Sequence, residues 1–430
     1  MPKTKFIRRS SAKQSVGGEV ENYYLHLGSK PSPKEHIIAT YRVESRFAWE
    51  KVATEIAAET SIGTWTQLST LKAPIARKLA GRVFNIDKKK KLIKIAYPLA
   101  LFEKASIPQL LSGLAGNVFS LRMIKNIRLE DLDFPQKYLN NFGGPAFGRN
   151  RVKYKLRAKN RPLIGAIMKP KIGLSASENA RLAYRLWVNG ADIVKDDENL
   201  TNLDFNQFKH RVEQVLYEKT KAQLVTKKKK MYVFNVTATP DVMMKRAKIV
   251  ERSGGKCVMV DIISVGLDNV QMLRKANLRL IIHGHRAGHS AFTRNPRHGI
   301  SYLVIAKLAR MAGVDQLHTG TVVGKMADVE EDVLEVNKSL TEKFGKFKPT
   351  LPIASGGLHP GLVPNLVKIL GKDIIINFGG GIHGHPSGSS AGARAASQAV
   401  EAVVKGKNIK AWANKKDNKE LKQALEHWGS

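Results

Sequence analysis

The sequence of 430 residues has one cysteine, no long apolar run and half as many acidic as basic side chains. The lone Cys257 excludes an internal disulfide framework and a zinc site built on several cysteines, and it is typical of a reducing compartment. No apolar run reaches the roughly 18–20 residues that span a bilayer, and Met1–Lys5 lacks the apolar core of a signal peptide. We therefore expect a soluble, cytoplasmic protein of two or three domains without a membrane partner.

The charge balance is strongly basic, with 72 Lys and Arg against 36 Asp and Glu, a net charge of +36. Such a surplus can bind a polyanion by releasing its counterions, or it can be a solvated basic surface. The runs Lys88–Lys91 and Lys227–Lys230 lie between apolar segments, as hairpin and helix–strand connections do. No zinc-finger spacing, aromatic RNA-binding signature or long basic tail accompanies them. The solvated surface is therefore preferred, and nucleic acid is not the expected partner.

Residues 1–137 mix helical and strand patterns and predict a small α+β domain of the ferredoxin-like kind. Helical spacing covers 46–59 and 107–116, a hairpin is expected at 82–86 and 92–97, and a strand at 121–129. The turn-rich segment 140–148 marks a boundary. Residues 138–430 are expected to form the second domain, which ends in a helical tail.

From residue 162 onward, short apolar strands alternate with helices, as in an α/β protein. The eight expected strands cover 163–168, 193–195, 231–236, 257–262, 280–285, 316–318, 351–354 and 374–378. The helices between them are expected at 176–189, 208–220, 240–253, 269–275, 301–311, 328–344 and 362–370, with a last helix at 391–404. Eight such units in about 250 residues predict a closed (β/α)8 TIM barrel rather than an open sheet.

Polar side chains recur where these strands end, which is where such barrels carry their chemistry. Each motif alone has an ordinary explanation, such as a tight turn or a hydrogen-bonded histidine pair, but solvated turns do not recur at the same end of nearly every strand. The residues are Lys169, Lys171, Lys195, Asp197, Glu198, Asn235, His283, His285, Arg286, His318, Lys325, Ser355, Gly356, Gly357, Gly379 and Gly380.

These residue types favour one kind of chemistry. Asp197 and Glu198 offer hard oxygen ligands, which suit Mg²⁺. Two glycine turns expose backbone N–H groups that suit phosphate, and Arg286, His318 and Ser355 can hold a second phosphate. Two anion sites around one metal indicate a bisphosphorylated, sugar-like substrate, from which a proton is taken next to a carbonyl.

The segments that carry these residues resemble the large subunit of ribulose-1,5-bisphosphate carboxylase/oxygenase (RuBisCO). The matching stretches in the barrel are GAIMKPKIG (165–173), GADIVKDDENL (190–200), HGHRAGH (283–289), HTGTVVGK (318–325), ASGG (354–357) and FGGGIHG (378–384). In the first domain they are AAETSIGTWT (57–66), GNVF (116–119) and RLEDL (128–132). The short length and the stretch GGIHGHPSG (380–388) are similar to the archaeal-type form III enzymes.

The resemblance implies the following roles. Lys195 would react with CO₂ to form a carbamate that holds Mg²⁺ together with Asp197 and Glu198. Lys169 would transfer protons at C2 of ribulose 1,5-bisphosphate, and His285 would assist hydration and proton handling. Lys325, on a mobile loop, would close over the substrate and stabilise the incoming carboxylate. The residues that would bind substrate are Glu59, Thr64, Trp65, Asn117, Lys171, Arg286, His318, Ser355, Gly356, Gly357, Gly379 and Gly380.

Glu59 and Asn117 would complete the site of a neighbouring subunit, so the resemblance implies a homodimer or a higher homo-oligomer, without a small subunit. The form III likeness implies a role in nucleotide-ribose (AMP) salvage. One departure is Met326-Ala327-Asp328 after Lys325, where the family usually has a glycine. A RuBisCO-like enolase or isomerase acting on another phosphorylated sugar is the alternative; such paralogues typically lack some of Glu59, Asn117, Lys169 and Lys325.

Overall fold

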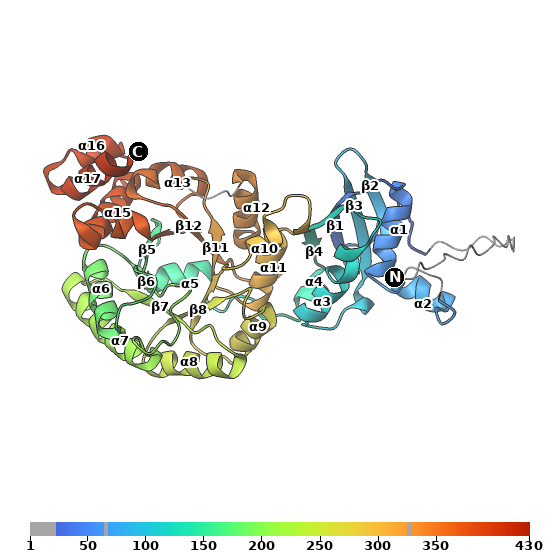
Figure 1. The fold of residues 1–430 in the computed structure, drawn as a ribbon, viewed down its shortest axis with the longest axis horizontal. Coiled ribbons are helices and arrows are strands. Elements are labelled where there is room, and N and C mark those ends of the chain that lie inside the picture. Colours follow the sequence, from blue (N-terminus) through green and yellow to red (C-terminus); the bar gives the residue numbers. More distant parts are fainter. Residues whose placement is uncertain (1–22, 64–67, 325–328) are drawn as a thin grey trace, which may run out of the picture.

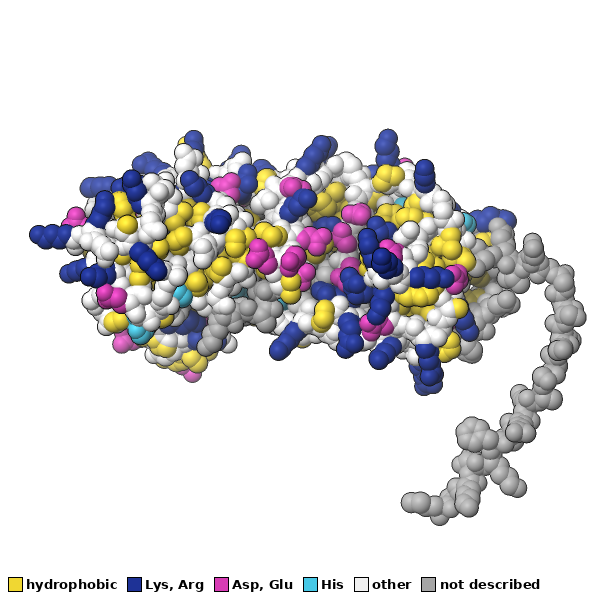
Figure 2. All heavy atoms as spheres, turned by 90° about the horizontal axis from the view of Figure 1, so that it is seen from above, with side chains coloured by type: hydrophobic (Ala, Val, Ile, Leu, Met, Phe, Trp, Pro, Cys, Tyr) yellow, Lys and Arg dark blue, Asp and Glu magenta, His cyan; other side chains and the backbone are white. Residues whose placement is uncertain are grey.

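The computed structural model describes residues 23–63, 68–324 and 329–430. It contains a small sheet domain beside a larger barrel, drawn at the right and left of Figure 1. In the described part of the chain no helix is both long and apolar enough to span a membrane. Lys and Arg side chains project from both ends of the face seen in Figure 2, so on this face the basic surplus is spread widely.

The first domain is built on four antiparallel strands in the order β4-β1-β3-β2, interleaved with helices as the ferredoxin-like expectation requires. Its elements are β1 (His36–Glu44), α1 (Trp49–Glu59), α2 (Ala73–Leu79), β2 (Arg82–Asp87), β3 (Leu92–Pro98), α3 (Ile107–Leu114), β4 (Asn126–Asp133) and α4 (Gln136–Leu139). The hairpin turns at Lys88–Lys91, as predicted. The central strand β1 was not predicted, although its buried and half-buried residues alternate along its whole length.

The second domain confirms the predicted barrel: eight parallel strands close on themselves in chain order. They are β5 (Leu163–Ile167), β6 (Ile193–Lys195), β7 (Met231–Asn235), β8 (Cys257–Asp261), β9 (Ile281–His285), β11 (Gln316–Gly320), β12 (Leu351–Ser355) and β13 (Ile375–Phe378). Their burial is nearly continuous rather than alternating, because residues on both faces of a parallel barrel strand are covered.

Helices surround the barrel and continue beyond it. They are α5 (Gly148–Lys155), α6 (Ala176–Val188), α7 (Phe208–Thr226), α8 (Pro240–Arg252), α9 (Leu267–Lys275), α10 (Ser290–Thr293), α11 (Tyr302–Ala312), α12 (Glu330–Thr341), α13 (Val363–Leu370), α14 (Gly380–His383), α15 (Gly388–Val404), α16 (Ile409–Ala413) and α17 (Lys419–Trp428). Local signals fix several ends: Ser175 and Glu178 form a capping box that starts α6, and Gly313 ends α11 in the left-handed conformation.

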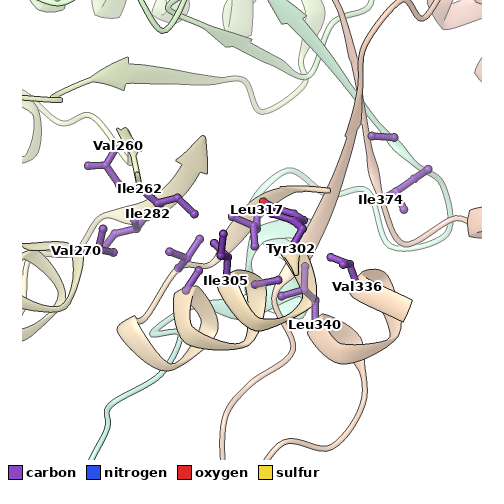
Figure 3. Close-up of a cluster of buried hydrophobic side chains, with 14 of the residues drawn as sticks. Val260, Ile262, Val270, Ile282, Tyr302, Ile305, Leu317, Val336, Leu340 and Ile374 are labelled. Atoms are coloured by element: carbon purple, nitrogen blue, oxygen red, sulfur yellow. The ribbon is translucent and has the colours of Figure 1, made fainter. Parts of the chain in front are cut away.

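Apolar side chains of strands and helices interlock between these layers. Figure 3 shows Val260, Ile282 and Leu317 from three barrel strands facing Val270 of α9 and Ile305 of α11. All five are at most 6% exposed. This packing fixes the strands, and with them the side chains that follow their carboxyl ends.

A short strand joins the two domains. The strand β10 (Gly299–Ile300) belongs to the chain of the barrel but pairs in parallel with β4 of the small sheet. Next to it, Ser301 Oγ donates to the carbonyl of Glu130 at 2.6 Å. A strand of two residues has no recognisable periodicity, so this fifth strand could not be predicted from the sequence.

Candidate active site at the carboxyl ends of the barrel strands

Lys195 is the last residue of β6 and is completely buried. Its Nζ donates to the carbonyl oxygen of Asp196 at 2.8 Å. Burial lowers the pKa of this amine, although the nearby carboxylates of Glu198 and Asp197 act in the opposite direction. The amine therefore loses its proton more easily than an exposed lysine, which favours its reaction with an electrophile.

The next two residues, Asp196 and Asp197, point to different surroundings, as neighbours on an extended chain do. Asp196 pairs with the equally buried Arg211 at 3.2 Å and accepts from the hydroxyl of Tyr232 at 2.6 Å. The backbone N–H of Asn235 also donates to it, at 2.9 Å. Asp196 is therefore held by structural partners, which leaves Asp197 for chemistry.

Asp197 and Glu198 each have a lysine nearby. Lys169 Nζ lies 2.5 Å from Asp197 Oδ2, and Lys171 Nζ lies 3.7 Å from Glu198 Oε1. Burial alone would raise the pKa of the Asp197 carboxyl, but hydrogen bonds from Lys169 and Asn199 outweigh it and lower that pKa. The strands β5 and β6 thus bring together the first two predicted motifs.

His285, at the end of β9, lies between two carboxylates. Its Nδ1 is 2.8 Å from Asp261 Oδ1, and its Nε2 is 3.8 Å from Glu198 Oε2. Because a carboxylate accepts, Nδ1 carries the hydrogen and Nε2 is directed toward the acidic residues after β6. Asp261 was not predicted, although it ends β8 and the strand-end rule applied to the fourth barrel strand would have found it.

His318 of β11 belongs to a hydrogen-bonded chain that runs from the part-buried Ser355 to buried groups. Ser355 Oγ lies 2.8 Å from His318 Nδ1, the Nε2 atoms of His318 and His283 are 2.9 Å apart, and His283 Nδ1 lies 2.8 Å from Gln316 Oε1. Burial holds the pKa of both histidines well below its usual value, so the rings are neutral. His318 would therefore meet a phosphate as a neutral ring rather than as a cation.

Arg286 lies on the same side of the barrel mouth as His318. Its guanidinium is 5.1 Å from the ring centre of Tyr302, whose hydroxyl donates to the His318 carbonyl at 2.5 Å. Arg286 also lines a cavity of about 390 Å³ between β4, α10 and α12. The predicted group Arg286, His318 and Ser355 is thus brought together.

The predicted glycines follow β12 and β13. Gly356 and Gly357 have φ values of +116° and +64°, which side chains rarely adopt, so both favour glycine. A Cβ on Gly379 would lie 3.6 Å from Cε of Lys169, and Gly380 has open space at the same position. The backbone around Gly379 and Gly380 can therefore be approached closely, beside Lys169.

The donor set at the barrel mouth fits Mg²⁺ in part. Asp197 and Glu198 supply hard oxygens, while the described residues contain no group of three His, Cys, Asp or Glu suited to a metal. A carbamate on Lys195, which is buried near both acids, would supply a third protein oxygen. With that oxygen the residues fit the ion.

Two predicted residues, Glu59 and Asn117, do not join this cluster within the described subunit. Thr64, Trp65 and Lys325 lie outside the described residues. Glu59 ends α1 in the first domain, on the side of the sheet far from the barrel in Figure 1. Asn117 is exposed in the short helix η2 (Asn117–Ser120) of the same domain, which contacts α1.

Two family models match the chain along almost its whole length. Residues 23–138 match the N-terminal domain of the ribulose bisphosphate carboxylase large chain, and residues 148–428 match its catalytic domain. The chain is 45% identical over 410 residues to the ribulose bisphosphate carboxylase of Pyrococcus furiosus, covering 94% of this chain and 97% of that protein. It is also 45% identical to the Methanocaldococcus jannaschii protein of the same name, over 94% of this chain and 99% of the relative.

Solved structures give the same result. The octameric RuBisCO of Pyrococcus horikoshii OT3 superposes with a TM-score of 0.91 at 43% identity, covering 95% of this chain and 96% of that one. The dimeric RuBisCO of Hyperthermus butylicus gives 0.87 at 39% identity, covering 95% and 100%. On this likeness of sequence and fold, the chain belongs to the ribulose bisphosphate carboxylase large-chain family and is an enzyme of that type.

Proposed function

We propose that the chain carboxylates ribulose 1,5-bisphosphate in a Mg²⁺-dependent reaction that gives two molecules of 3-phosphoglycerate. The observation that carries the proposal is the grouping of Lys169 with Asp197, and of His285 with Glu198, around the buried Lys195. Mg²⁺, when bound by Asp197, Glu198 and the carbamate of Lys195, would stabilise the negative charge that develops next to the substrate carbonyl. O₂ would compete with CO₂ as the co-substrate.

The carbamate requires a neutral amine. Its formation joins the Lys195 nitrogen to the carbon of CO₂ and releases one proton. Burial lowers the pKa of Lys195 and so increases the neutral fraction at a given pH. The carbamate would then take the C3 proton of the substrate.

Lys169 and His285 would handle the remaining protons. CO₂ adds at C2, water adds at C3, and the bond between C2 and C3 breaks, which leaves a carbanion at C2 that needs one proton. Lys169 is the donor proposed for that proton, and His285, with Nδ1 held by Asp261, is proposed to assist the hydration. Lys325 is proposed to close over the site and stabilise the new carboxylate.

The substrate phosphates would bind on two sides of the mouth. Arg286, with the neutral His318 and Ser355, suits one phosphate. The other phosphate would be bound by the glycine turns Gly356–Gly357 and Gly379–Gly380, together with Thr64 and Trp65. Lys171, which lies near Glu198, is also proposed to contact the substrate. Because α1 lies far from the barrel of its own chain, Glu59 and Asn117 are proposed to complete a second subunit's site, in a homodimer or larger assembly without a small subunit.

We further propose a cytoplasmic role in the salvage of nucleotide ribose. The reaction is tested by preincubating the protein with Mg²⁺ and CO₂ and measuring radiolabel from CO₂ in 3-phosphoglycerate. Incorporation is expected. Exchange of the C3 proton with solvent, without labelled product, would instead favour an enolase or isomerase, and a folded sample without either reaction would refute both.

A further inference from the structure

A second candidate binding site lies in the first domain, away from the barrel strand ends. It is a groove of about 720 Å³, bordered by the beginning of β1, the end of α2, the segment that follows β3, and α4. Its volume is in the range of small-molecule sites, roughly 300–1,000 Å³. None of the residues proposed above for catalysis or substrate binding lines it.

Four cationic side chains from separate parts of the domain meet at this groove: Lys78, Arg82, Lys104 and Lys137. Glu35 is the one acidic residue that lines it. Among the described residues, none of the four cations forms an ion pair, whereas many other basic side chains of the protein do. Their unbalanced charge suits an anion with more than one charge, such as a chain of phosphates.

The same groove has an apolar part with a buried polar group. Phe102 and Tyr138 line it, with ring centres 6.2 Å apart and an edge-on arrangement. Tyr138 is only 3% exposed, and its hydroxyl has no hydrogen-bond partner among the described residues. Burial, followed by the charge of Glu103, raises the pKa of Tyr138 to about 12, so the hydroxyl keeps its proton and can donate.

We propose that this groove binds a nucleoside phosphate, with the phosphates on the four cations and the base against the half-buried ring of Phe102. A flat ring suits the aromatic part, because stacking of a base on an aromatic side chain stabilises binding without requiring a particular base. The unpartnered Tyr138 hydroxyl is closed to solvent, so the ligand accepts its hydrogen bond only where the neighbouring side chains move aside on binding. No step of the proposed carboxylation uses the groove, so binding here is independent of that proposal.

The test is calorimetric titration of the full-length protein with ATP, with tripolyphosphate and adenosine as comparison ligands. ATP is expected to bind more tightly than either, because only ATP uses both parts of the groove. Tripolyphosphate binding as tightly as ATP would overturn the assignment of a nucleoside site. Absence of ATP binding, as when a second subunit covers the groove, would overturn it as well.

Variants locate the site. The double variant Lys78→Glu/Lys137→Glu is expected to weaken ATP binding at least tenfold, about 1.4 kcal/mol or more. The matched control Lys209→Glu/Lys368→Glu makes the same charge change on α7 and α13 and is expected to bind as the parent does. Equal loss in both variants would show a general charge effect and refute the site.

Tyr138→Phe separates binding from structure. It removes the unpartnered hydroxyl and keeps the ring, so the thermal midpoint is expected to stay within about 2 °C or to rise. ATP affinity is expected to fall roughly fivefold, as for one lost hydrogen bond. Unchanged affinity in a folded Tyr138→Phe protein would remove the tyrosine from the site.

Discussion

The carboxylate of Asp261, at the end of β8, accepts the hydrogen of Nδ1 of His285, at the end of the neighbouring strand β9, over 2.8 Å. The pair is brought together by the barrel itself, because Asp261 and His285 are register partners in the ladder between these strands. The contact fixes the ring orientation and the tautomer, so Nε2 faces Glu198.

Asp261→Asn is expected to lower kcat by about tenfold to a hundredfold, with a smaller change in KM. The amide has the same shape as the carboxylate but does not stabilise a positive charge on the ring, so the pH profile of kcat should change too. Steady-state carboxylation kinetics from pH 6 to 9 measure both effects.

The control for this experiment is Asp268→Asn, which neutralises an exposed acid in the first turn of α9. It should behave as the parent enzyme does. If Asp261→Asn also retains full activity with an unshifted pH profile, His285 is positioned without Asp261 and the assigned role is wrong.

The sequence predicted the barrel well because each strand is a short apolar run bounded by turns, and the strand-end rule then located Lys169, Asp197 and His285. The sequence did not show that Asp196 has structural partners, because Arg211 and Tyr232, which contact it, belong to later elements of the chain. That distinction depends on packing between distant segments, which local periodicity does not encode.

Asp196→Asn is expected to destabilise the fold by about 3–5 kcal/mol, because it leaves the buried guanidinium of Arg211 without its countercharge. Asp197→Asn is expected to cost less stability, because its partner Lys169 is partly exposed. It is expected to lower activity at least a hundredfold, because Asp197 is a proposed ligand of Mg²⁺. Urea unfolding and carboxylation assays on both variants compare them. The reverse ranking would contradict the division of roles between these neighbours.

Lys195→Ala and Lys195→Met are expected to abolish carboxylation, lowering it more than about a thousandfold, because neither side chain can take up CO₂. Lys195→Met has nearly the volume of lysine and should unfold at or above the parent temperature, whereas Lys195→Ala leaves a cavity. Circular dichroism and labelled-CO₂ incorporation provide the two readings. Activity in either variant would eliminate the carbamate.

The division of the chain at residues 137 and 138 remains a proposal, and the junction between the domains shows why sequence is a poor guide there. Gly299 of β10 pairs with Arg128 of β4 across 171 positions of chain. A two-residue strand carries no alternating pattern, and its position depends on the shape of both domains. Elements defined by long-range contacts alone therefore escaped prediction. The strand β1 was also missed, although its alternation was present in the sequence.

Stability should depend on pH through Lys230, which immediately precedes β7. Its Nζ donates to the Ala191 carbonyl at 2.7 Å. Burial lowers the pKa of this amine to about 8. Between about pH 8 and the unfolded value near 10.4, the Lys230 amine is mostly protonated in the unfolded chain and mostly neutral in the folded one. The free energy of unfolding therefore rises with pH through this window.

Lys230→Met should raise the free energy of unfolding at pH 7 by on the order of 2 kcal/mol more than it does at pH 10. Urea unfolding at both pH values measures this difference, with Lys368→Met, at an exposed lysine of α13, as the control that should show none. An equal effect of Lys230→Met at pH 7 and pH 10 would mean that the buried amine does not titrate in this range.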